Sequence, residues 1–122
     1  MDNMNKIKNI IQALSEHKDS EKAVELLTEL GTNSSDDEIR ELTAQALIKR
    51  NTNESLRVVL VSKGKGINDL SARVAMTSIN ELLSLKDKTE AVKILDESIN
   101  KEEEDEEVRN TARSVRALIT FA

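Results

Sequence analysis

Apolar residues recur every three or four positions along most of the chain, which is the spacing of one face of an α-helix. This spacing predicts seven helices, at residues 3–16, 20–30, 36–50, 53–62, 68–85, 88–99 and 105–121. We expect Ser20 to cap the second helix and Gly31 to end it in a left-handed conformation. The glycines in residues 63–66 should break the chain between the fourth and fifth helices. The valines near residue 59 could also form a strand, but a lone strand has no pairing partner, so helix is favoured.

Three of these segments share a local pattern, in which Asp lies four residues before Arg and a less polar residue immediately precedes the Arg. The three triplets are Asp36/Ile39/Arg40, Asp69/Ala72/Arg73 and Asp105/Val108/Arg109, at separations of 33 and 36 residues. Asp at a helix start accepts hydrogen bonds from free backbone N–H groups. Arg one turn later can reach that Asp, or the Asp of the neighbouring unit. We therefore expect a structural ladder of Asp–Arg pairs along stacked helical hairpins.

This arrangement resembles HEAT-like repeats, of the short type found in phycobilin lyases and many scaffold proteins. The triplets carry the resemblance, which covers about residues 20–121. The chain departs from the family pattern in having no proline, and in having Thr43 and Met76 where Ala is usual. The resemblance implies an all-α single domain over residues 1–122, with a capping helix at residues 3–16. Three hairpins, at about residues 20–50, 53–85 and 88–121, would then stack into a short α-solenoid whose second helices line an inner binding surface.

The composition limits the chemistry that the chain can perform. It has no Cys, one His (His17), one aromatic residue (Phe121) and a net charge of −5. Zinc sites and nucleophilic cysteine chemistry lack their usual side chains, so we expect no catalytic site, cofactor or metal. Negative charge and missing aromatic platforms disfavour nucleic acid, although a stripe of the arginines could still attract it. With no stretch long enough to cross a membrane, we expect a cytoplasmic protein.

Three further features have a structural and a chemical interpretation. The acidic run at residues 102–107 could attract calcium or a basic partner, but acidic groups also favour a helix start. The segment at residues 63–66 could contact an anion, although it lacks the spacing of a phosphate-binding loop. His17 lies where the dipole of the first helix favours a cation. We favour the structural interpretation of all three. An enzyme or a chromophore-handling protein would rest on fold analogy alone.

Our candidate binding surface is the face of each second helix opposite its core stripe. Counting 100° per residue from the central residue of each triplet gives a mixed apolar and charged stripe. It comprises Glu41, Ala44, Ile48, Val74, Thr77, Glu81, Asn110, Arg113 and Ala117. Ile48 and Val74 could instead pack against adjacent repeats. We predict a non-enzymatic module that presents this stripe to a protein partner. The alternative is a homo-oligomer assembled through Leu118, Ile119 and Phe121.

Overall fold

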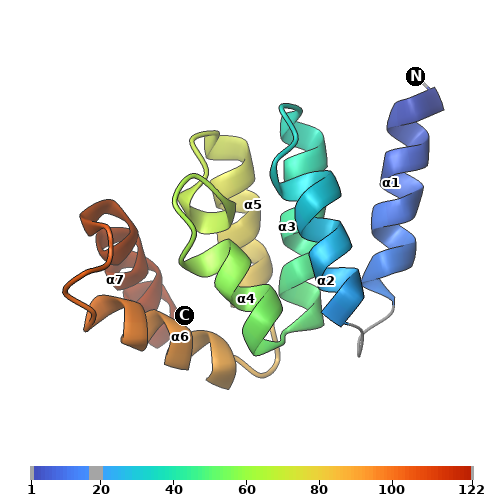
Figure 1. Ribbon diagram of the computed structural model, residues 1–122. Helices are drawn as coiled ribbons and strands as arrows, with labels where there is room; N and C mark the ends of the chain where they lie inside the picture. The colour runs from blue at the N-terminus through green and yellow to red at the C-terminus, as the bar shows by residue number, and fades with distance from the viewer. Residues whose placement is uncertain (1, 17–20, 122) are drawn as a thin grey trace.

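The computed structural model describes residues 2–16 and 21–121, and its regular structure there is helical (Figure 1). The expected cap Ser20 and the single histidine His17 lie outside the described residues. The α-helices are α1 (Asp2–Ser15), α2 (Glu21–Leu27), α3 (Asp37–Arg50), α4 (Asn53–Leu60), α5 (Ala72–Leu83), α6 (Thr89–Ile99) and α7 (Glu106–Phe121). A π-helical turn, η1 (Thr28–Thr32), extends α2, and a 3₁₀ turn, η2 (Gly66–Asn68), precedes α5.

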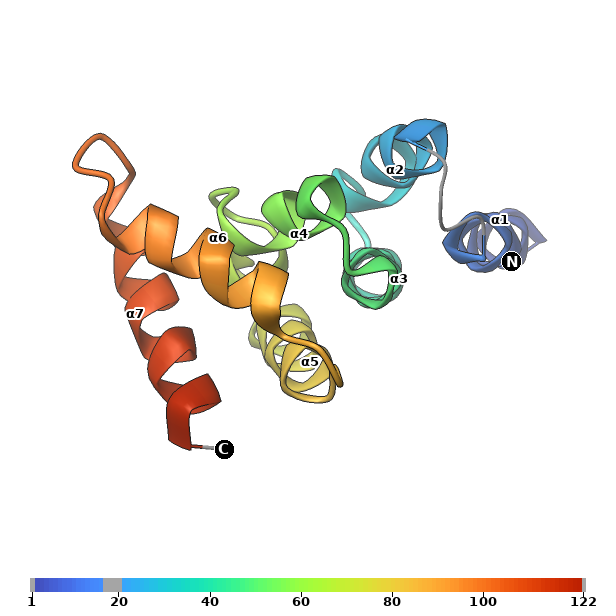
Figure 2. The same ribbon diagram turned by 90° about the horizontal axis from the view of Figure 1, so that it is seen from below.

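The first six helices form two rows (Figures 1 and 2). In one row α3 packs between α1 and α5, and in the other α4 packs against α2 and α6. The last helix departs from this order, because α7 packs against α6 and η2 and makes no comparable interface with α5. The core between the rows contains leucines that are fully buried: Leu27, Leu47, Leu56, Leu60, Leu82 and Leu95.

The middle helix α3 is enclosed by its neighbours on most sides. It contacts α1, α5, α4 and η1. Five of its six apolar residues are consequently buried, and they lie all round the helix rather than along one stripe: Ile39, Ala44, Ala46, Leu47 and Ile48. The sixth, Leu42, is partly buried. Between residues 43 and 50, only Gln45 and Lys49 retain exposure.

Two expected helix boundaries differ from the structure. Gly31 does not adopt a left-handed conformation; it lies inside η1 and is buried against Thr43 of α3. Its lack of a side chain therefore serves close packing between two elements. The fifth helix begins at Ala72 instead of residue 68, because Gly66 turns the chain at φ 58° and η2 follows it. The Asn68 side chain then donates a hydrogen bond to the Leu60 carbonyl at 3.1 Å, which ties this turn to the end of α4.

Candidate functional site

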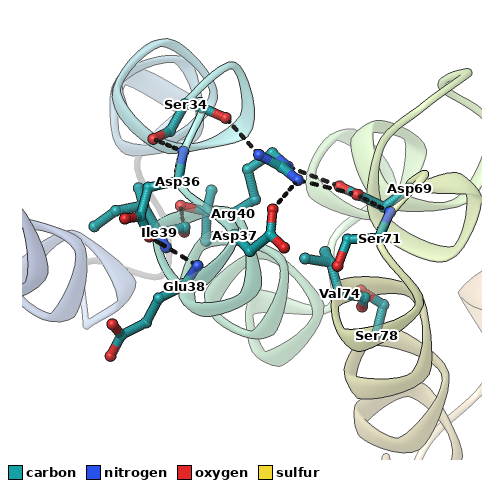
Figure 3. A network of polar contacts seen from close by, with 11 residues as sticks. Ser34, Asp36, Asp37, Glu38, Ile39, Arg40, Asp69, Ser71, Val74 and Ser78 are labelled. Carbon is teal, nitrogen blue, oxygen red and sulfur yellow. Dashed lines mark hydrogen bonds and ion pairs between the residues drawn. The ribbon is translucent and has the colours of Figure 1, made fainter.

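A network of polar contacts surrounds the start of α3 (Figure 3). Asp36 caps the helix, since its Oδ1 accepts hydrogen bonds from the backbone N–H groups of Glu38 at 2.8 Å and Ile39 at 3.1 Å. The Ser34 hydroxyl accepts from the Asp36 N–H at 3.1 Å, and the Ser34 carbonyl accepts from Arg40 Nη1 at 2.8 Å. The loop that enters α3 is therefore held by side chains on both sides of the helix start.

Arg40 links this first unit to the second. Its Nε donates to Asp69 Oδ2 at 3.0 Å and its Nη2 to Asp69 Oδ1 at 3.3 Å, while Nη2 also contacts Asp37 at 2.6 Å. The side chain of Asp69 is only 2% exposed and that of Arg40 is 18% exposed. The hydrogen bond to Asp69 is the main cause that raises the pKa of Arg40. This bidentate bond is the expected pairing between neighbouring units.

The ladder does not continue in the same form beyond this pair. Arg73 pairs with Glu41 at 3.0 Å, and Arg109 donates to the Ile99 carbonyl at 3.1 Å. Asp105 caps α7, because it accepts from the Glu107 N–H at 2.9 Å, and it pairs with Lys63 at 3.3 Å. The reason is the position of α7: since it packs on α6 and not on α5, Arg73 and Asp105 are not brought together.

The expected binding stripe is not a single surface. Ala44, Ile48 and Val74 are buried, contrary to expectation, and the alternative that Ile48 and Val74 pack inside the protein is the observed one. Counting angles from one apolar residue failed because α3 is covered by neighbours on several sides. The other members of the stripe retain exposure: Glu41, Thr77 and Glu81 partly, and Asn110, Arg113 and Ala117 openly.

Four polar members of this stripe form hydrogen bonds within the protein. Glu41 accepts from the Thr77 hydroxyl at 2.6 Å and from Arg73 Nε at 3.1 Å. The Thr77 hydrogen bond first, and then the Arg73 hydrogen bond, lower the pKa of Glu41. On α7, Arg113 donates to Asn110 at 2.6 Å. These contacts join α3 to α5 and stabilise α7.

A groove of about 390 Å³ lies between α2 and α4, which are neighbours along one row (Figures 1 and 2). We call it the α2–α4 groove, and it is lined by Lys22, Val24, Glu25, Leu26, Thr28, Glu29, Glu54 and Val58. It combines apolar side chains with carboxylates from both helices. The sequence pattern did not reveal it, although Glu25 and Glu29 lie four residues apart beside Leu26, a spacing that places two charges along one side of a helix.

Four large apolar side chains are exposed near α5 and α7. Leu70 is 98% exposed, Phe121 88%, Met76 55% and Leu118 46%. Leu70 also lines a smaller hollow with Val108 and Thr111 of α7. Each of these side chains leaves apolar surface in contact with solvent, as do Ile10 and Leu30 elsewhere in the described residues.

The acidic run at residues 102–107 and the segment at residues 63–66 both form contacts within the protein. The acidic run leads into α7, where Asp105 is the capping residue. In the segment at residues 63–66, Lys63 pairs with Asp105. Among residues 2–16 and 21–121, no cluster of His, Cys, Asp or Glu could hold a metal ion. No helix in those ranges is long and apolar enough to cross a membrane.

The Arg40–Asp69 pair gives a first testable prediction. Asp69→Asn should lower the free energy of unfolding by about 2 kcal/mol, because a largely buried guanidinium loses the carboxylate that neutralises it. Urea denaturation followed by circular dichroism measures this. The matched control is Asp105→Asn, which keeps a good capping residue and alters only an exposed pair, so its loss should be much smaller. Equal losses in the two variants would contradict a stabilising role for the bridge.

Comparison with known proteins adds no relationship: no family model matches this sequence, and no curated protein or solved structure matches it.

Proposed function

We propose that this protein is a non-enzymatic interaction module, built as a short HEAT-like solenoid, that binds a protein partner in the α2–α4 groove. The groove is the observation that carries the proposal. It offers the exposed parts of Leu26 and Val58, with glutamates at its rim. Apolar surface gives a partner helix or segment binding energy, and charge beside it fixes the orientation in which the partner binds.

The roles of the other charged side chains support an interaction module rather than a catalyst. Arg40, Arg73 and Arg109 each join one helix or loop to another. These contacts stabilise the packing of the helices, and this structural role explains the Asp–Arg pattern in the sequence. The groove itself contains carboxylates, one lysine, one threonine hydroxyl and apolar groups, which suit recognition.

The proposed surface lies on the first helices of two hairpins, instead of on the second helices as the sequence pattern suggested. It is short, because α2 has 7 residues and α4 has 8. A small interface without an aromatic anchor of its own should bind with modest affinity.

Affinity capture from an extract of the native cells tests the proposal. The wild-type chain is compared with a groove variant, E25K/E29K/E54K, and with a matched control, E102K/E103K/E106K, that reverses three exposed glutamates elsewhere. We expect one defined protein to be retained by the wild type and the control and lost from the groove variant. Identical retention by all three, or none by any, would overturn the groove as the binding site.

The apolar residues near α5 and α7 favour a second candidate function, self-assembly. Leu118 and Phe121 are exposed on the last helix, where a terminal repeat normally has a polar face. Sedimentation equilibrium of the wild type distinguishes the two candidates. A defined oligomer that becomes monomeric in L118S/F121S, with no captured partner, would replace the interaction module with a self-assembling protein.

A further inference from the structure

We infer that the segment bound in the α2–α4 groove is a short amphipathic one, with Lys or Arg beside one or two large apolar residues. This inference rests on the proposed function and names the chemistry of its partner. It follows from three properties of the groove: its unneutralised charge, its apolar lining and its length.

Negative charge at the groove is not neutralised within the described part of the chain. Glu29 and Glu54 form no ion pair there, and Glu25 has only a 3.9 Å contact with Lys22 in which both side chains are mostly exposed. Three carboxylates and one ammonium group thus line the groove, a formal charge of −2. A partner with positive side chains would supply the missing counter-charges and would be steered to the groove.

Three other carboxylates in the same row of helices have partners. Glu97 of α6 pairs with Arg57 at 2.8 Å, and Asp96 pairs with Arg116 at 3.0 Å. Glu90 accepts a hydrogen bond from the Asn53 side chain at 2.8 Å. Among the described residues of this row, the acidic side chains without a close internal partner therefore lie on α2, on η1 and at the start of α4, and three of them line the α2–α4 groove. A basic partner should therefore prefer the groove to the α4–α6 side of the row.

The side chains that line the groove indicate what the partner segment needs in addition to Lys or Arg. Val24 is buried beneath the groove, while Leu26 and Val58 are partly exposed. These side chains are small or medium in size, and no aromatic residue lines the groove. Binding energy in such an interface comes from a large apolar anchor inserted by the partner. Charge alone would leave this apolar surface in water, so a purely basic segment should bind less well than an amphipathic one.

The helix on one side of the groove, α4, limits the length of the segment that the groove can hold. Eight residues of α4 extend roughly 12 Å at the rise of an α-helix. This corresponds to about two turns of a partner helix, enough for apolar residues at positions i and i+4 with basic residues on either side. The partner is accordingly a short linear segment rather than a broad folded surface.

Fluorescence anisotropy with labelled helical peptides of about 12 residues tests the inference. The first peptide carries Leu at i and i+4 flanked by Lys; the second has Glu in place of Lys; the third scrambles the first and so keeps its charge without its stripe. We expect wild-type protein to bind the first peptide at least about tenfold more tightly than the other two, and more weakly as salt rises.

Variants of the protein test whether the first peptide binds in the α2–α4 groove. E25K/E29K/E54K should bind the first peptide at least about tenfold more weakly, whereas E102K/E103K/E106K should remain within about twofold of wild type. Val58→Thr, which keeps the side-chain shape but replaces one methyl group with a hydroxyl, should weaken binding about threefold. Equal affinity for the first and scrambled peptides, or no loss in the groove variant, would overturn the inference. If a captured partner still depended on the groove, the proposed function would stand with a partner of different chemistry.

Discussion

Gly66→Ala should lower the free energy of unfolding by about 4 kcal/mol, the largest loss that we expect from any single methyl group in this chain. Gly66 has φ 58°, a conformation that L-residues with a side chain rarely adopt. A Cβ atom there would also lie 2.2 Å from the Val59 carbonyl oxygen and 2.5 Å from the Val59 Cα. Because these are backbone atoms of α4, no side-chain rotation can relieve the overlap.

Gly64→Ala is the matched control. Gly64 has φ 77°, so alanine is strained there as well, but a Cβ atom at this position would have no heavy atom within 4 Å outside its own chain neighbours. Gly64→Ala should therefore lower the free energy of unfolding by about 1 kcal/mol, because only the backbone conformation is strained. Urea denaturation of both variants separates the two causes. Losses of similar size would show that the turn moves away from α4 and that the overlap with Val59 is not what makes Gly66 necessary.

The positions of the helices could largely be predicted from the sequence, because their signals are local. The apolar spacing marks α6 and α7 closely, and the glycines at residues 64 and 66 separate α4 from α5. Asp36 and Asp105 cap α3 and α7, as their place before an apolar helix predicts. A cap depends on only three or four neighbouring residues, and the chain carries that information by itself.

The binding face could not be predicted in the same way, because exposure depends on which helices are neighbours. The angular count treated α3 as a helix with one buried stripe, whereas α1, α4, α5 and η1 surround it. One signal was present: the apolar residues of α3 occupy most of its circumference, from Ile39 to Ala44 and Ile48. Such a distribution indicates a helix buried on several sides.

Two features that the sequence did not predict, the α2–α4 groove and the partner of Arg73, both depend on packing between distant segments. The α2–α4 groove brings Glu25 and Glu29 together with Glu54, which belongs to a different helix much further along the chain. Likewise, Arg40 meets Asp69 because α3 packs against α5 and η2, whereas Arg73 pairs with Glu41 and not with Asp105 because α7 packs on α6. The repeated Asp–Arg motif therefore predicts the capped starts of α3 and α7, but not that of α5, where Asp69 follows η2 and does not cap the helix. It predicts a pairing partner only where successive units stack alike.

Gly31→Ala should lower the free energy of unfolding by about 3 kcal/mol, because it overfills the contact between η1 and α3. A Cβ atom on Gly31 would lie 1.7 Å from Thr43 Oγ1 and 2.6 Å from Thr43 Cβ. Thr43 is fully buried, and its hydroxyl donates to the Ile39 carbonyl at 2.7 Å, so it has little freedom to move. Urea denaturation of the variant measures the loss.

A double-mutant cycle with Thr43→Ala identifies the cause. Removing Oγ1 and Cγ2 relieves most of the overlap, so the double variant should be more stable than the sum of the two single losses predicts, by about 1 kcal/mol. Additive losses would show that the overlap is not responsible. The same pair links packing to binding, since η1 also carries Glu29 of the α2–α4 groove. If η1 is displaced from α3, Gly31→Ala should weaken binding of the basic amphipathic peptide, and Thr43→Ala should restore part of it.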